Sequence, residues 1–153
     1  MAGKEIIEML NRALEMEHQA NIQYLSHAEV VDGINCEAII ERLKEIANDE
    51  KGHAEKIRAL IGDYLDGVPA ITIAKARNAS TITEILKTNI EDEKSAVDYY
   101  SKILGKINEN KAGLPYSFTK LEHDVRHILM EEQEHISELR RLLAMKLAEM
   151  EKM

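Results

Sequence analysis

The sequence predicts an all-α protein, a four-helix bundle with one long connection between its second and third helices. Three observations support this fold class. The 153 residues include only seven glycines and two prolines, which favours long helices over many short strands. Apolar residues recur at every third or fourth position in four separate stretches, as on the buried face of a helix. Residues 66–80, about 15 positions, separate the second stretch from the third.

The composition narrows the classes of function. Hydrophobic residues make up 44% of the chain and aromatic residues only 4%, so the expected single domain (1–153) has an aliphatic core. The net charge of −8 argues against a nucleic-acid partner, because phosphate binding needs a cationic surface. No apolar run is long enough to cross a bilayer, so no membrane partner is expected. Cys36 is the only cysteine, which excludes an internal disulfide and indicates a reducing cytoplasm.

The first two helices are expected at about 3–31 and 36–65. Glutamates interrupt their apolar stripes where leucine would be typical, and a buried carboxylate needs a cation or a proton. The first stripe reads Leu10, Leu14, Glu17, Asn21, Tyr24 and Ala28, and the second reads Ile39, Leu43, Ile46, Glu50, His53, Ile57, Leu60 and Tyr64. Asn35 is the expected N-cap of the second helix. Gly52 either gives room for close packing or is a tolerated surface glycine.

The connection at 66–80 can span roughly 50 Å when extended, whereas a helix of about 28 residues is roughly 42 Å long. It can therefore cross the whole bundle and leave the second and third helices parallel. The third helix is expected at about 81–108, opened by a capping box of Thr81 and Glu84. The fourth is expected at about 115–150, with Pro115 in its first turn.

Two Glu-x-x-His pairs carry the functional signal, because this spacing places both side chains on one face of a helix. Two such pairs, with one inward glutamate from each of two further helices, form a two-metal site inside a four-helix bundle. Both halves of the chain show the order Glu, Tyr seven residues later, then Glu-x-x-His. The expected metal ligands, all on the inward stripes, are Glu17, Glu50, His53, Glu93, Glu132 and His135.

Carboxylate and imidazole ligands suit iron and manganese, with zinc as a further option. Glu50 and Glu132 are the expected bridging ligands, and Glu17 and Glu93 the terminal ones. Each histidine needs a partner for its outer ring nitrogen; Asp49 and Glu131 are candidates, although solvated carboxylates are an equal alternative. Tyr24, counted with the six ligands as catalytic, and Tyr100 either bond the terminal glutamates or are ordinary core tyrosines.

Other candidates are weaker. A third match, Glu15 with His18, lies off the inward stripe and is interpreted as solvated. Glu91 rivals Glu93 but is out of phase with its stripe. His123 and His127 are four residues apart and could bind a metal together, but the pattern is more typical of surface histidines. His27 has no evident partner.

At these residues the sequence resembles the ferritin-like di-iron superfamily, and bacterioferritin most of all, over about residues 3–145. The segment at 17–24 (EHQANIQY) is similar to the bacterioferritin motif on the first helix. The segments at 49–53 (DEKGH) and 65–69 (LDGVP) resemble the second-helix motif and the start of the crossover. The resemblance implies two iron ions per chain, held by the six ligands, at which O₂ or H₂O₂ takes electrons from Fe²⁺.

The sequence also departs from that pattern. Lys51 stands where bacterioferritin has a haem-ligating methionine, so haem is not expected. Bacterioferritin has a fifth short helix after its last ligand, and only 18 residues follow His135 here, which leaves the size of the expected homo-oligomer open. Ala96 replaces the additional glutamate of rubrerythrins, and a single cysteine excludes a rubredoxin domain.

Three functions remain open from the sequence. The favoured one is a ferroxidase-type oxidoreductase that serves iron storage or detoxification, with Fe²⁺ and O₂ or H₂O₂ as its partners. The second is a rubrerythrin-like enzyme that reduces peroxide or O₂ without storing iron. The third is a bundle in which a metal only holds the helices together, although a structural zinc site needs only four ligands.

Overall fold

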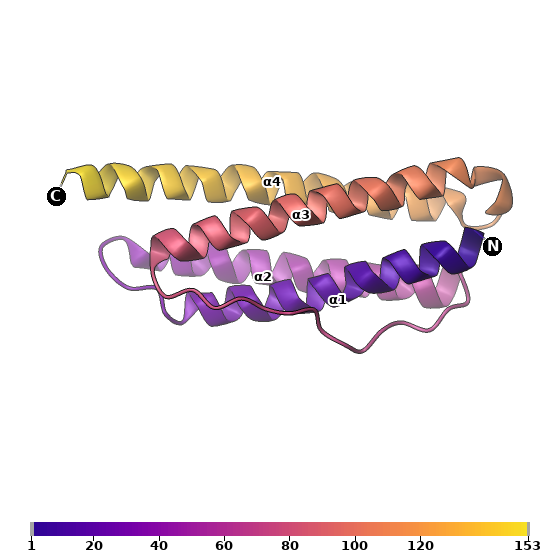
Figure 1. Cartoon of the computed structure of the whole chain (residues 1–153), viewed down its shortest axis with the longest axis horizontal. Helices are drawn as coiled ribbons and strands as arrows, with labels where there is room; N and C mark the ends of the chain where they lie inside the picture. Colours follow the sequence, from indigo (N-terminus) through magenta and orange to yellow (C-terminus); the bar gives the residue numbers. More distant parts are fainter. Residues whose placement is uncertain (1, 153) are drawn as a thin grey trace.

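The computed structural model describes residues 2–152 and confirms the all-α four-helix bundle (Figure 1). Its long helices are α1 (Ala2–Ala28), α2 (Cys36–Ala59), α3 (Ile82–Glu109) and α4 (Phe118–Glu151). A π-helical turn, η1 (Leu60–Tyr64), extends α2, and a 3₁₀ turn, η2 (Lys111–Gly113), follows α3. The connection after η1 returns along the bundle, so α2 and α3 run in the same direction, as the length of the connection predicts.

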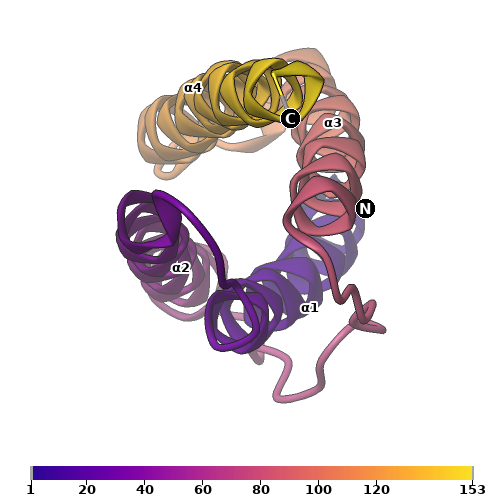
Figure 2. The ribbon, with the colours of Figure 1, turned by 90° about the vertical axis from the view of Figure 1, so that its left-hand side faces the viewer.

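The four helices surround a common centre in the order α1, α2, α4, α3 (Figure 2). Packing is most extensive within the hairpins α1–α2 and α3–α4, and α1 and α3 join the hairpins to each other. The edge between α2 and α4 is packed more lightly. Polar contacts bridge that edge; the Arg42 Nε donates to Glu138 Oε2 over 2.6 Å.

The aliphatic core is divided into two clusters. One lies toward the η1 end and includes Leu10, Ile57 and Ile128, and the other lies toward the start of α3 and includes Leu43 and Leu86. Full burial of each such side chain is worth roughly 1.5–3 kcal/mol. The buried carboxylates lie along the helices between the two clusters, so apolar packing on both sides fixes their positions.

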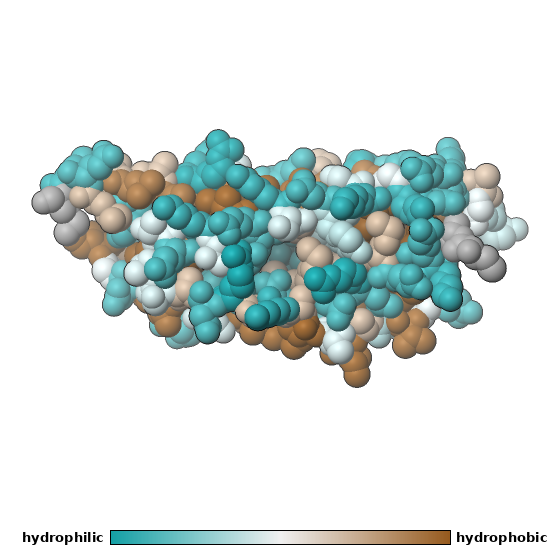
Figure 3. Space-filling model, viewed as in Figure 1, coloured by the Kyte–Doolittle hydropathy of each residue, from teal (hydrophilic) through white to brown (hydrophobic). Residues whose placement is uncertain are grey.

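The connection between α2 and α3 is bound along one face of α1. Asn11 accepts from the Ala70 N–H over 2.7 Å and donates to the Val68 carbonyl over 3.0 Å. Farther along, the Arg77 N–H donates to Gln23 Oε1 over 2.7 Å. Apolar side chains of the connection stay exposed (Figure 3), most of all Val68, Ile71 and Ile73.

Several expected helix ends are shifted. α1 ends at Ala28 rather than near residue 31, and α4 begins at Phe118 because Pro115 lies in the preceding turn. Asn35 has a left-handed backbone (φ 63°) and makes no capping bond; its side chain donates to Glu149 Oε1 instead. Tyr64, expected on the inward stripe, is 42% exposed. The π-helical turn has more residues per turn than an α-helix, so it rotates this position away from the core.

The capping box at the start of α3 forms in a shifted arrangement. Thr81 accepts from the Glu84 N–H over 3.1 Å, as expected, but Glu84 bonds the backbone of Ser80 rather than that of Thr81. Within residues 2–152, every helix is too short or too polar to cross a membrane.

Candidate metal centre

The six predicted ligands converge at the middle of the bundle. α1 supplies Glu17, α2 supplies Glu50 and His53, α3 supplies Glu93, and α4 supplies Glu132 and His135. None is more than 2% exposed. Their donor atoms form two groups, each with all atoms within 4.8 Å of one another, namely Glu17, Glu50, His53 and Glu132, and Glu50, Glu93, Glu132 and His135. Glu50 and Glu132 belong to both groups, which is the arrangement that bridging ligands require.

Both histidine rings face the centre with the same atom. The Nδ1 of His53 lies 3.0 Å from Glu17 Oε2, and the Nδ1 of His135 lies 3.3 Å from Glu93 Oε2. The outer nitrogens are also occupied. The Nε2 of His135 pairs with Asp49 at 2.9 Å, and the Nε2 of His53 pairs with Glu131. Each outer partner is thus a half-exposed carboxylate from the opposite hairpin, which fixes the ring orientation.

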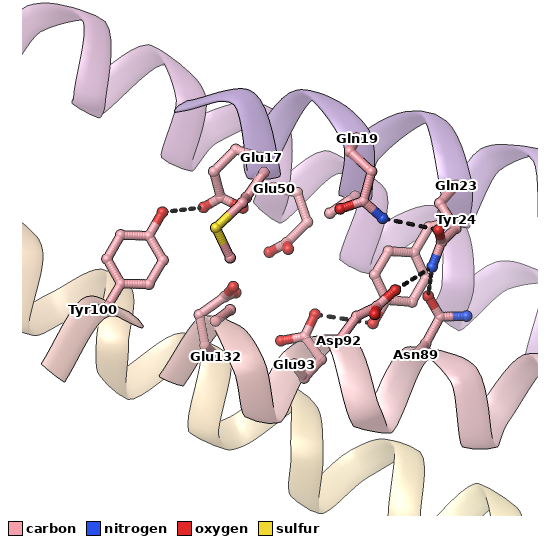
Figure 4. Close-up of a pocket in the computed structure, with 13 residues that line it drawn as sticks. Glu17, Gln19, Gln23, Tyr24, Glu50, Asn89, Asp92, Glu93, Tyr100 and Glu132 are labelled. Atoms are coloured by element: carbon pink, nitrogen blue, oxygen red, sulfur yellow. Dashed lines mark hydrogen bonds between the residues drawn. The ribbon is translucent and has the colours of Figure 1, made fainter. Parts of the chain in front are cut away.

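Two buried tyrosines hold the terminal glutamates, Glu17 and Glu93 (Figure 4). The Tyr24 hydroxyl donates to Glu93 Oε1, and the Tyr100 hydroxyl donates to Glu17 Oε2, both over 2.9 Å. Each bond runs between the hairpins, from α1 to α3 or from α3 to α1. The tyrosines therefore orient the terminal glutamates, and they link the two hairpins of the bundle.

The donor set fits a pair of divalent metal ions. Glu50 Oε1 and Glu132 Oε1 are buried and make no hydrogen bond; each lies only within 3.2–3.5 Å of the Nδ1 atoms of both histidines, an arrangement that a bound cation would complete. Within residues 2–152, the ion pairs of the four central glutamates are made with histidines alone. Four carboxylates and two divalent ions would come close to neutrality in a poorly solvated interior.

The pKa values of the predicted ligands reflect the close packing of four carboxylates and two imidazoles. Burial and the neighbouring charge of Glu132 raise the pKa of Glu93 to about 8. Burial alone would lower the pKa of His135, but Glu132 and Glu93 raise it to about 11. Burial alone would raise the pKa of Glu132, yet the two histidines hold it at about 2. The metal-free centre therefore stores protons that metal binding would displace.

The other candidates do not join the centre. Glu15 and His18 are half-buried and bond the connecting segment at Thr72 rather than being fully solvated. Glu91 is exposed and pairs with Arg77. His123 and His127 lie on the surface with their ring centroids 4.2 Å apart. A Cβ at Gly52 would meet no atom within 4 Å, so close packing does not explain this glycine.

Sequence reasoning missed a buried polar row beside the centre. Gln19 and Gln23 on α1 and Asn89 on α3 are 9% exposed or less, and Asp92 lies next to them. A signal was present, because Gln19 and Gln23 are four residues apart and share a helix face. His27 is also buried, and it bonds Asn89 and the Arg77 carbonyl.

The sequence profile of the ferritin-like domain matches residues 7–148. The chain belongs to the ferritin-like family. A curated relative is the bacterioferritin of Desulfovibrio desulfuricans, 29% identical over 101 residues, which are 65% of this chain and 56% of that protein. The match thus spans little more than half the length of that bacterioferritin.

Two solved structures extend the likeness over nearly the whole chain. Ferritin-like, diiron-carboxylate proteins from Bacillus anthracis superpose with a TM-score of 0.85 at 27% identity, covering 94% of this chain and 98% of theirs. The bacterioferritin-related protein of Bacteroides fragilis, described as a dodecameric thioferritin, gives 0.84 at 27% identity over 98% of this chain and 90% of its own. This ferritin-like protein therefore has relatives with diiron sites.

Proposed function

We propose that this ferritin-like protein binds two Fe²⁺ ions per chain and oxidises them with O₂ or H₂O₂. The observation that carries the proposal is the pair of overlapping four-residue donor groups that share Glu50 and Glu132. The two unpartnered oxygens belong to these same two residues. A structural ion would need one group of four ligands, whereas this centre offers two groups built symmetrically around a shared pair.

The six side chains take distinct roles in this proposal. Glu50 and Glu132, which belong to both donor groups, would be shared between the two ions, and Glu17 and Glu93 would each hold one of them. His53 and His135 bind through Nδ1, because their Nε2 atoms are already paired with Glu131 and Asp49. Bound iron would supply the electrons that reduce O₂ or H₂O₂, while carboxylate and imidazole ligands suit both its ferrous and ferric states.

The surrounding residues prepare the ligands. Tyr24 and Tyr100 act as positioning residues, since each fixes the rotamer of one terminal glutamate through a 2.9 Å bond. The pairs of His53 with Glu131 and of His135 with Asp49 keep a proton on each Nε2, so the proton that a metal ion displaces from each ring is the one on Nδ1, which faces the centre.

We further propose that the chain forms a closed homo-oligomer. The bacterioferritin-related neighbour is described as a dodecamer, and exposed apolar side chains along the connection provide surface for subunit contacts. α4 continues as one helix to Glu151, so no fifth helix lies within residues 2–152. The number of subunits is therefore the property that light scattering should establish first.

The decisive experiment is an anaerobic Fe²⁺ titration of the metal-free protein followed by exposure to O₂. Binding that saturates at two Fe²⁺ per chain, and then oxidises, is the expected result. Continued uptake far beyond two per chain indicates storage, and uptake that stops at two favours a redox enzyme. Failure to bind or oxidise iron would contradict the proposal and leave a structural metal.

A further inference from the structure

The four central glutamates line a small cavity whose other walls come from α1 and α3. Its volume is ≈ 20 Å³, which is room for about one water molecule or metal ion. Besides the ligands, its wall includes Gln19, Gln23 and Asp92. The side chain of Asp92 is 31% exposed, so one carboxylate reaches both the solvent and the space beside the metal ligands (Figure 4).

The wall of this cavity includes small and polar side chains. Ala20 and Ala96, one on each helix, are small side chains that border it. The amide of Gln23 donates to Asp92 Oδ2 over 2.7 Å and to Asn89 Oδ1 over 3.0 Å. Gln19 donates in turn to Gln23 Oε1 over 2.8 Å. Side-chain oxygens of this kind can replace part of the hydration of a cation as it moves inward.

Next to this cavity, Asp92 is paired with a cation of the protein itself, Arg77. Arg77, from the connection between α2 and α3, donates to Asp92 Oδ1 over 2.7 Å and to Glu91 Oε2 over 3.1 Å. The Arg77 side chain is 43% exposed, and an exposed ion pair of this kind is weak, because water and salt screen it. An incoming divalent cation can therefore compete with Arg77 for the same oxygen.

The alternative approaches suit cations less well. A hollow of ≈ 260 Å³ between α1, α2 and the connection reaches Glu17 itself, but Lys51 and Arg58 also line it and would repel a cation. On the α2–α4 edge, Asp49 and Glu131 are bonded to the outer nitrogens of the histidine ligands. A metal ion arriving there would have to displace the rings that are to bind it.

We propose that metal ions reach the centre between α1 and α3, with Asp92 as their first ligand and Arg77 as a displaceable cap on that ligand. The inference rests on the proposed metal-binding function of the centre. Asp92 lies on the Glu93 side, so the group of Glu93 and His135 fills before the group of Glu17 and His53. The cap offsets the charge of Asp92 until a divalent ion outcompetes it.

The backbone of Arg77 makes the cap testable. The connection is held there by the main chain, since the Arg77 N–H donates to Gln23 and its carbonyl pairs with His27 Nε2 at 2.8 Å. Substituting the side chain therefore leaves this anchor in place. Asp92→Asn likewise keeps the shape of the residue and removes its charge.

The test is stopped-flow loading of the metal-free protein with Co²⁺, a probe that stays divalent in air and reports binding by its visible absorbance. Asp92→Asn should slow loading about tenfold, and Arg77→Gln should speed it severalfold at low salt. Both should still bind two Co²⁺ per chain. In the double variant Arg77→Gln should have no further effect, because the cap acts through Asp92.

Matched controls are Asp98→Asn, an exposed acid on the same helix, and Arg126→Gln, an arginine paired with Glu122 on α4. Both should load within twofold of the unmodified protein. Unchanged rates in Asp92→Asn and Arg77→Gln, with full loading, would overturn the route and leave the metal centre standing. No Co²⁺ binding by the unmodified protein would instead overturn the proposed function, and the route with it.

Discussion

The centre consists of two half-sites that match in their ligands and differ in their surroundings. The first half-site is Glu17 and His53 with Tyr100 and Glu131, and the second is Glu93 and His135 with Tyr24 and Asp49. Glu93 and Tyr100 each lie 76 residues after their counterparts, Glu17 and Tyr24. The same offset relates Met16 to Asp92 and Gln23 to Tyr99. Near-symmetry in the ligands thus coexists with different neighbours, because Met16 and Tyr99 occupy the positions that correspond to Asp92 and Gln23.

The difference separates two tasks of the bundle. In the proposed function, holding two similar ions would need two similar sets of donors, and the repeat provides them. Bringing ions in would need only the one route proposed between α1 and α3. Substitutions of ligands and of their neighbours should therefore reveal whether the two half-sites are equivalent once filled.

The largest effect is expected where the half-sites overlap. Glu50→Ala removes a donor from both groups and should lower metal binding from two ions to at most one, with the fold retained because a buried negative charge is lost. Glu93→Ala should lose only the ion on its own side. Metal content by mass spectrometry under native conditions measures both. Glu55→Ala, an exposed site on the same helix, should keep two ions, and two ions in Glu50→Ala would refute the bridging role.

The next effect concerns pH. Glu93, with a pKa of about 8, and His135, with a pKa of about 11, both hold protons at pH 7 in the metal-free protein. Each must lose its proton to bind metal, so affinity for Zn²⁺ should rise by at least about tenfold per pH unit between pH 6 and 8. A pH indicator in weak buffer should detect the released protons. Affinity that is flat with pH would show that the centre is already deprotonated.

The same pKa values set the stability of the metal-free fold. The pKa of Glu93 is raised above its ordinary value, so its protonated form stabilises the fold at low pH and that contribution is lost as the pH rises through about 8. The melting temperature should therefore fall from about pH 4.5, the ordinary pKa of a glutamate, to about pH 8. Glu93→Gln, which stays neutral, should flatten this fall, and an unchanged slope would assign the loss to another group.

A smaller effect should distinguish the two tyrosines. Tyr24→Phe frees Glu93 and Tyr100→Phe frees Glu17, so each should weaken one half-site about tenfold and destabilise the fold by about 1 kcal/mol. Stepwise Co²⁺ titration combined with thermal melts measures both quantities. Tyr116→Phe, at a position that is 97% exposed, is the matched control. Equal weakening of both steps by either variant would mean that the half-sites act as one unit.

The smallest effect is expected at the outer carboxylates. Asp49→Asn and Glu131→Gln still accept a hydrogen bond from Nε2, and both positions are about half exposed, so each should cost less than about tenfold in affinity. Isothermal titration with Zn²⁺ would resolve it. A loss as large as that of Glu93→Ala would instead make these acids ligands in their own right.

The fold and the six converging residues could be predicted from the sequence because both depend on helical periodicity. A glutamate or histidine that interrupts an apolar stripe is visible in any helix of this length. Asp49 and Glu131 could be named from the sequence as candidate partners of the histidines, but the pairing of His53 with Glu131 and of His135 with Asp49, across the bundle, could not be assigned, because it depends on how the helices cross. The prediction that Tyr64 lies on the inward stripe was wrong for a related reason, since a π-helical turn changes the phase of the apolar stripe. The contact between Arg77 and Asp92 could not be predicted either, because it joins an irregular connection to a helix and no shared sequence periodicity relates the two.

One consequence follows from the sharing of donors between the hairpins. The group around Glu17 borrows Glu132 from α4, and the group around Glu93 borrows Glu50 from α2. A chain cleaved within the connection would yield two fragments, each carrying half of the donors and no complete group. Under the proposed function, metal ions would bind only the reunited form, so a rising metal concentration should drive the fragments to reassemble. Bound metal would therefore hold the two hairpins together.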